Sequence, residues 1–175
     1  MTRHVPRRWT APVAGRPVLV GVEPAQESHV VQEAAALARA LGTGLVCLWV
    51  DEAHVVAEHE PDGTLDLVPT DSDRDEPDDQ VPDDALVARL AEHLDPTGVP
   101  WLFVYATGEP VHGLREVAEA YDARLIAVGA RRHGLGPWVN ELIGGSIAGR
   151  LAHTQERPVL VVPAPRPGRP VGPGA

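Results

Sequence analysis

Lysine is missing from this chain altogether: all fifteen basic residues are arginine, against 25 acidic residues, so the formal net charge is −10. Without lysine there is no phosphate-loop lysine, no Schiff-base lysine and no lysine general base. The same absence disfavours a response-regulator receiver, which needs a lysine beside its phosphoryl site. The acidic balance argues against nucleic acid as the main partner, because phosphate neutralisation requires a basic face.

Cysteine and long apolar runs are also scarce. The single cysteine, Cys47, cannot form an intramolecular disulfide, which excludes a disulfide-rich secreted scaffold and fits a reducing cytosol. No apolar run approaches the roughly 18–20 residues of a membrane span. Arg7 and Arg8 are not followed by the apolar segment of an export signal. We therefore expect a cytoplasmic protein with no membrane partner.

Length and composition predict one domain with three atypical segments. A chain of 175 residues can bury a core without covalent staples. Residues 1–15 are predicted to form a flexible arm and residues 164–175 a flexible tail, which leaves a single domain over residues 16–163. Residues 51–84 hold 14 acidic residues against one arginine. Their centre, residues 57–81, is predicted to be a disordered or loosely held loop, because like charges repel.

The remainder alternates between short apolar runs and amphipathic segments. The runs typical of buried strands lie at residues 17–22, 44–50, 99–105, 125–128 and 158–162. The segments with helical spacing lie at residues 27–41, 82–94, 111–121 and 146–153. This alternation predicts an α/β fold with an open, five-stranded parallel sheet, Rossmann-like, and helices on both faces. For this fold type we assume the strand order 3-2-1-4-5, counted along the sequence. Its switch point, where ligands bind, then lies between the first and fourth strands.

A glycine-rich loop connects the fourth predicted strand to the last predicted helix. Its glycines, at positions 129, 134, 136, 144 and 145, would let backbone N–H groups approach an anion closely. Ser146 begins the helix, so its hydroxyl and the next N–H groups would face a phosphate at that terminus. Arg131 and Arg132 add positive charge beside it. A phosphate site and a purely structural turn both remain open as interpretations.

Other chemistry finds little support. His54 and His59 lie among glutamates, but their spacing matches no standard metal site. Residues 144–148 lack the last glycine of a nucleophile elbow, so Ser146 is not expected to act as a nucleophile. Cys47 falls within a predicted strand and is expected to be a small core residue, not a redox thiol. We expect no metal site and no catalytic residue.

Taken together, these features resemble the universal stress protein family. The resemblance extends over about residues 16–55 and 82–163. It includes the glycine loop, the strand at residues 158–162 and the sequence Thr-Gly-Glu-Pro at residues 107–110, before the third helix. No one of these motifs would be specific by itself, but their combination is.

The glycine motif matches the family pattern in part. In the family, a strand ends in glycine, a second glycine follows after two residues, and glycine with serine or threonine follows after nine more. Gly129 matches the first glycine, and Gly145 with Ser146 matches the closing pair. The second position is occupied by Arg132, and the nearest glycine, Gly134, is separated from Gly145 by ten residues.

The resemblance also implies a binding site for ATP, with Mg²⁺ when ATP is bound. In ATP-binding members an acidic residue after the first strand, the glycine loop and a residue ending the second strand surround the nucleotide. The implied cofactor-binding residues are Val22, Glu23, Val50, Val128, Gly129, Gly134, Gly145, Ser146 and Ile147. Glu23 stands where the family usually has aspartate. Members that lack the motif often bind no nucleotide. Because of Arg132 and the longer loop, a nucleotide-binding protein and a nucleotide-free protein both remain open.

The resemblance implies a regulatory or stress-response module that is not an enzyme and works as a homodimer through the strand at residues 158–162. The alternative is an ATP-cleaving or adenylating enzyme on a related nucleotide-binding α/β fold. Such an enzyme would need a catalytic lysine, a Ser-Gly-Gly-x-Asp-Ser loop or a His-x-Gly-His pair. The sequence contains none of these, so we expect the regulatory module.

Overall fold

The computed structural model describes residues 5–9, 15–24, 28–52, 54–59, 65–69, 84–130 and 146–164. The first half of its domain comprises β2 (Val18–Gly21), α1 (His29–Ala40), β3 (Leu45–Asp51) and α2 (Asp84–Leu94). The second half comprises the short 3₁₀ helix η1 (Asp95–Thr97), β6 (Trp101–Thr107), α3 (Pro110–Ala120), β7 (Leu125–Gly129), α5 (Ile147–Thr154) and β8 (Val159–Val162). Each strand and helix predicted from the periodicity is present, with ends shifted by a few residues.

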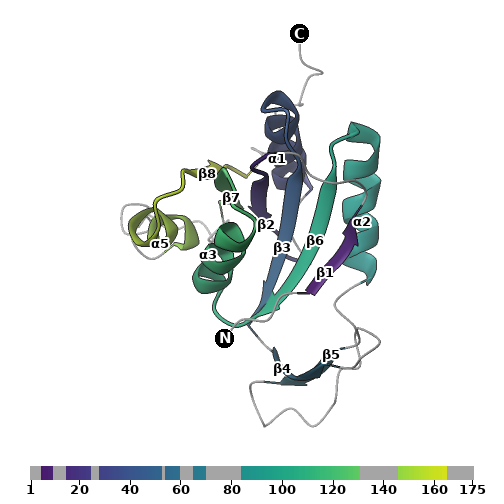
Figure 1. The fold of residues 1–175 in the computed structure, drawn as a ribbon, viewed down its shortest axis with the longest axis vertical. Helices are drawn as coiled ribbons and strands as arrows, with labels where there is room; N and C mark the ends of the chain where they lie inside the picture. Colours follow the sequence, from purple (N-terminus) through teal and green to yellow (C-terminus); the bar gives the residue numbers. More distant parts are fainter. Residues whose placement is uncertain are drawn as a thin grey trace.

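The main sheet has six strands in the order β1-β6-β3-β2-β7-β8 (Figure 1). From β6 to β8 every pair of neighbours is parallel. Numbered along the sequence, these five parallel strands have the order 3-2-1-4-5, which confirms the predicted topology. The chain reverses its direction of travel across the sheet between β2 and β7, so the switch point lies there.

The two faces of the sheet are covered by different helices (Figure 1). Side chains alternate along β2, where Val18 and Val20 pack in the core beneath α1 and α2, and Leu19 packs in the core beneath α3 and α5. The bulky Trp101 and Phe103 of β6 lie in the first of these cores. Burial on both faces explains why the strands appear in the sequence as continuous apolar runs.

β1 (Val5–Trp9) differs from the flexible arm predicted over residues 1–15. It pairs antiparallel with β6, from Val5 opposite Tyr105 to Trp9 opposite Leu102. An uncovered β6 would present a row of unpaired backbone N–H and C=O groups, and β1 satisfies them. This pairing is made by the backbone and needs no apolar alternation. The segment contains a proline and two arginines, so the sequence pattern does not predict a strand there.

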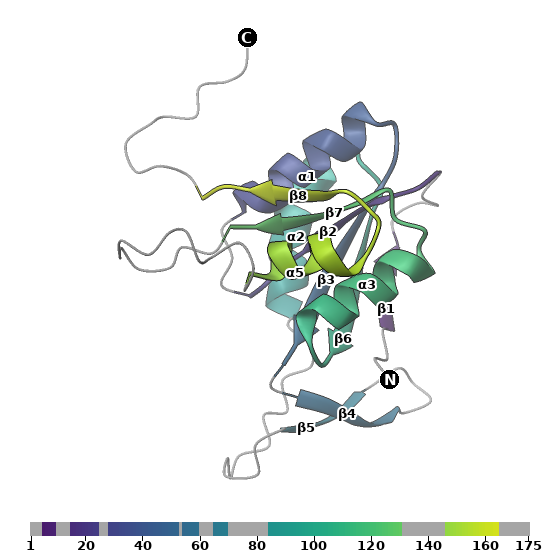
Figure 2. The same ribbon diagram turned by 90° about the vertical axis from the view of Figure 1, so that its left-hand side faces the viewer.

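The acidic segment also contains structure that was not predicted. β4 (His54–His59) and β5 (Leu65–Pro69) form a two-stranded antiparallel sheet that overlaps the loop expected at residues 57–81. This small sheet lies beyond the carboxyl ends of β3 and β6 (Figures 1 and 2). The remainder of that loop, and residues 165–175 of the predicted tail, lie outside the described residues.

Cys47 confirms its predicted role as a core residue. It lies in the middle of β3, fully buried, and burial raises the pKa of its thiol. A thiol held protonated in an apolar core is a poor nucleophile. In the part of the chain that the structure describes, no helix combines the length and the apolar character needed to cross a membrane.

Candidate functional site

Three strand ends meet at the switch point. β2 lies between β3 and β7 and pairs in parallel with both, so the carboxyl ends of the three strands are neighbours at one edge of the sheet. Val22 extends β2 by one more bond, since its backbone N–H donates to the carbonyl of Leu48 at 2.8 Å. The predicted site residues at these ends are Val22, Glu23, Val50, Val128 and Gly129.

The N-terminus of α5 provides the next part of the predicted site. Ser146 is the N-cap residue, and its Oγ accepts a hydrogen bond from the backbone N–H of Gly149 at 3.1 Å. Ile147 begins the helix and packs against the core beneath α3 and α5. Ser146 therefore begins the helix as predicted. The first N–H groups of any helix have no carbonyl partner within it and carry the positive end of the macrodipole, which suits an anion.

The loop between β7 and α5 lies outside the described residues. It contains Gly134 and Gly145, as well as Arg131 and Arg132. The phosphate-binding part of the predicted site therefore stays a prediction. The described part consists of the three strand ends and the start of α5.

Val50 is held in place by the close approach of α3. Its side chain packs against the core beneath α3 and α5. A Cβ added to Gly113 of α3 would lie 2.9 Å from Val50 Cγ2 and 3.2 Å from its Cγ1. Glycine at position 113 thus allows α3 to lie directly on the end of β3.

A buried polar pair, which was not predicted, secures the same strand end. Tyr105 Oη donates a hydrogen bond to Asp51 Oδ2 at 3.1 Å, and both residues are buried. Burial, the charge of Asp51 and this hydrogen bond together raise the pKa of Tyr105. The rings of Trp49 and Tyr105 form a T-shaped pair, with 5.2 Å between their centroids. The β3–β6 register brings these residues together, and that register is not visible in either strand's sequence alone.

The Thr-Gly-Glu-Pro sequence forms the start of α3 and joins it to α5. Gly108 has a φ of +114°, which strongly favours glycine, and its N–H donates to the Asp51 carbonyl at 2.9 Å. Glu109 is the N-cap residue, and its carboxylate accepts from the N–H groups of Val111 and His112 at 3.2 and 2.9 Å. Arg150 of α5 donates to the same carboxylate at 2.8 Å.

The protonation of Glu109 reflects these contacts. Partial burial raises its pKa, but the backbone hydrogen bonds from His112 and Val111 and the guanidinium of Arg150 outweigh burial and lower the pKa below its usual value. The carboxylate therefore stays charged at neutral pH. It links the N-terminus of α3 to the first turns of α5, beside the switch point.

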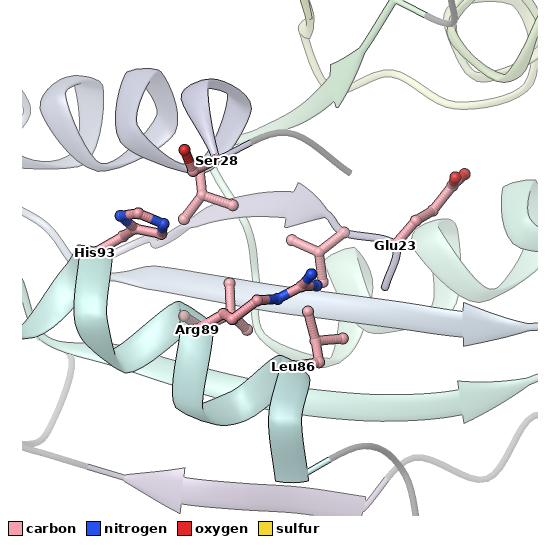
Figure 3. Close-up of a pocket in the computed structure, with 8 residues that line it drawn as sticks. Glu23, Ser28, Leu86, Arg89 and His93 are labelled. Carbon is pink, nitrogen blue, oxygen red and sulfur yellow. The ribbon is translucent and has the colours of Figure 1, made fainter. Parts of the chain in front are cut away.

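A pocket of about 200 Å³ lies next to the turn after β2, between α1 and α2 (Figure 3). Its apolar lining consists of Val22, Val31, Leu86 and Leu90, and its polar lining of Glu23, Ser28, Arg89 and His93. The carboxylate of Glu23 points away from Ser28, Arg89 and His93 (Figure 3). The guanidinium of Arg89 donates a hydrogen bond to the carbonyl of Pro24 in the turn.

Metal ligation finds no support in the described ranges. Among their side chains there is no group of three or more His, Cys, Asp or Glu residues that could hold a metal ion.

The fold defines a doubly wound α/β protein whose candidate site lies at the switch point of the sheet. The family model described as "Universal stress protein family" matches residues 15–163. The chain therefore belongs to the universal stress protein family. No curated protein matches the chain significantly.

Solved structures are similar in fold. A universal stress protein in complex with cAMP is 20% identical with a TM-score of 0.58, and the match covers 84% of this chain and 95% of that one. A universal stress protein from Archaeoglobus fulgidus is 18% identical with a TM-score of 0.58, covering 84% and 93%. A universal stress protein from Archaeoglobus fulgidus in complex with dAMP is 16% identical with a TM-score of 0.55, covering 84% and 97%. At these identities the likeness establishes the fold alone.

Proposed function

We propose that this family member is a regulatory stress-response module that binds an adenine nucleotide, ATP with Mg²⁺, at the switch point and catalyses no reaction of its own. The observation that carries the proposal is the meeting of three strand ends with the N-terminus of α5 in a parallel sheet. Two structures of similar fold were solved with cAMP and with dAMP.

The residues at this edge suit the parts of such a ligand. Gly129 presents no side chain, and the start of α5 offers backbone donors, so the phosphates belong there. Glu23 cannot attract a phosphate directly, since both are anionic. Its carboxylate, which points out of the α1–α2 pocket (Figure 3), is suited to the ribose hydroxyls or to a hydrated Mg²⁺. The adenine would then extend toward Val50.

The absence of catalysis belongs to the same proposal. The chain has no lysine to stabilise or attack a phosphoryl or acyl group, and it lacks the loop motifs of the adenylating and ATP-cleaving enzymes on related folds. Incubation with ATP and Mg²⁺ should therefore leave the nucleotide intact. Formation of ADP, AMP or pyrophosphate in proportion to protein concentration would favour the enzyme instead.

Assembly as a homodimer is also proposed. β8 forms one edge of the sheet, and its Leu160 and Val161 are 36% and 46% exposed. An apolar strand edge with free backbone groups is a template for pairing. We infer that β8 meets the β8 of a second copy across a two-fold axis.

Isothermal titration calorimetry tests the nucleotide proposal. Purified full-length protein is titrated with ATP, with and without Mg²⁺, and with GTP as a control for the base. We expect binding of ATP, weaker binding of GTP, and a smaller effect of Mg²⁺ on the Glu23→Gln variant. No heat with millimolar ATP and Mg²⁺, together with an unchanged melting temperature, would contradict the proposal.

A further inference from the structure

We infer that Arg89 of α2 is a positioning residue for the nucleotide site, because it holds the turn that carries Glu23. This inference rests on the proposed function. Its structural basis is the hydrogen bond from Arg89 Nη2 to the carbonyl of Pro24, which links residues 65 positions apart in the sequence.

The turn follows directly on the end of β2. The N–H of Val22 donates to the carbonyl of Leu48 and so bonds the last part of β2 to β3. Pro24 has no backbone N–H, so it cannot donate a bond to either neighbouring strand. Glu23 itself is exposed. The carbonyl of Pro24 is therefore an anchoring point for the turn, and its donor comes from a helix on one face of the sheet.

The position of Arg89 on α2 explains how it reaches the turn. Leu86 and Leu90, on either side of it, are buried at 3% and 4% exposure and fasten α2 to the sheet. Arg89 lies at the rim of the α1–α2 pocket, and its guanidinium extends toward the turn (Figure 3). A rigid helix thus supplies a planar donor at a fixed distance from Pro24, whereas lysine would offer a smaller ammonium on a more flexible stem.

Loss of this donor should act through Glu23. Without it the turn can adopt more conformations, and the carboxylate of Glu23 is no longer held ready for the ribose or Mg²⁺. The turn then has to become ordered when the nucleotide binds, and the entropy cost of this ordering weakens binding. In a variant whose residue 23 cannot hold the ribose or Mg²⁺, loss of the Arg89 donor should not weaken nucleotide binding further. The reason is that Arg89 bonds to the turn and not to the ligand.

A double-mutant cycle separates this role from a direct contact with the nucleotide. MgATP affinity is measured by calorimetry for the parent, Arg89→Met, Glu23→Gln and the double variant. Methionine keeps an unbranched apolar stem over the pocket and removes the donors. We expect Arg89→Met to weaken binding roughly three- to tenfold, the equivalent of one hydrogen bond. We expect the double variant to bind no more weakly than Glu23→Gln alone.

Two further variants distinguish positioning from general destabilisation. Arg89→Lys, which retains a donor, should recover part of the affinity lost in Arg89→Met. Arg115→Met removes an exposed arginine from α3, on the other face of the sheet, and should bind like the parent. If Arg89→Met fails to fold, Arg89→Gln takes its place in the cycle. The glutamine side chain is too short to reach the turn, so the same loss of affinity is expected.

The remaining outcomes contradict either the inference about Arg89 or the proposed function. Binding by Arg89→Met within twofold of the parent overturns the inference while leaving the proposed function intact. Additive losses in the cycle also overturn it, since they would mean that Arg89 affects binding independently of Glu23. A parent protein that binds no nucleotide overturns the proposed function, and the inference with it.

Discussion

Tyr105 and Asp51 show how single side chains secure the edge of the sheet at which the candidate site lies. The hydroxyl of Tyr105 donates to a carboxylate that is itself only 8% exposed, at the last residue of β3. A carboxylate in such a place is costly unless its hydrogen bonds are satisfied. The pair therefore favours one arrangement of the β3 and β6 ends, on which the candidate site depends.

Replacement of Tyr105 by phenylalanine should destabilise the fold. It removes a donor from the buried carboxylate of Asp51, a loss of about 1–3 kcal/mol in the free energy of unfolding. Urea denaturation at pH 7 measures this change. Equal stability of the parent and Tyr105→Phe would mean that the hydrogen bond contributes nothing to the fold.

The same variant should alter the response to alkali. Folding raises the pKa of Tyr105, so above about pH 10 the unfolded chain releases a proton that the folded protein retains. The stability that this tyrosine contributes is complete below that pH and is lost as the pH rises further. Between pH 8 and 11, the unfolding free energy of the parent should fall more steeply than that of Tyr105→Phe. Parallel curves would contradict this.

At the scale of the element, α3 links two parts of the candidate site. Its N-terminus is capped by Glu109 and joined to Arg150 of α5, and its Gly113 lies against Val50 at the end of β3. The helix thus connects the end of β3 to the start of α5. A displacement of α3 would therefore change two parts of the candidate site together.

Alanine at position 113 should test this close approach. The new Cβ would lie 2.9 Å from Val50 Cγ2, and overpacking of this kind costs about 1–3 kcal/mol. The better helix propensity of alanine returns about 1 kcal/mol, so we expect a net loss of stability. Val50→Ala is the matched background, because it removes both methyl groups that cause the conflict. In that background Gly113→Ala should cost less, and an equal cost in both, measured by urea denaturation, would contradict the packing argument.

The elements that could be predicted are those that bury apolar side chains. Residues 125–128, Leu-Ile-Ala-Val, indicate a strand because both faces of β7 are covered. β1 and the β4–β5 pair were not predicted, since a short edge strand or hairpin rich in charge gives no such pattern. Within the site, the cap at Ser146 could be predicted from local sequence. The Arg89–Pro24 and Tyr105–Asp51 bonds could not, because they join residues that only the tertiary fold brings together.

At the scale of the whole molecule, the two edges of the sheet differ. β1 forms one edge of the sheet, and β8 forms the other (Figures 1 and 2). If both edges of the sheet paired with other copies, the assembly would grow into open chains. If only one edge pairs with the same edge of a second copy, the assembly closes as a dimer. The sequence of β1 contains Pro6, Arg7 and Arg8, residue types that oppose edge pairing, whereas β8 is apolar. Pairing through β8 alone is therefore favoured, which supports the proposed two-fold dimer over a larger array.

A charge placed on β8 should separate the two copies. Val161 is 46% exposed, so Val161→Lys leaves the core of a single copy intact while opposing edge-to-edge pairing. Light scattering at micromolar concentration should give a dimer mass for the parent and a monomer mass for the variant. Ala152→Lys, at an exposed position of α5, is the control and should remain dimeric. A monomeric parent would refute the dimer.

The central claim is that an adenine nucleotide binds at the switch point, and amide chemical shifts measured during a titration with ATP and Mg²⁺ test it most directly. We predict saturable shifts that concentrate at Val22, Glu23, Val50, Gly129 and Ser146, the residues of the three strand ends and the start of α5. An absence of shifts at millimolar nucleotide, or shifts confined to surfaces away from these residues, would contradict the account.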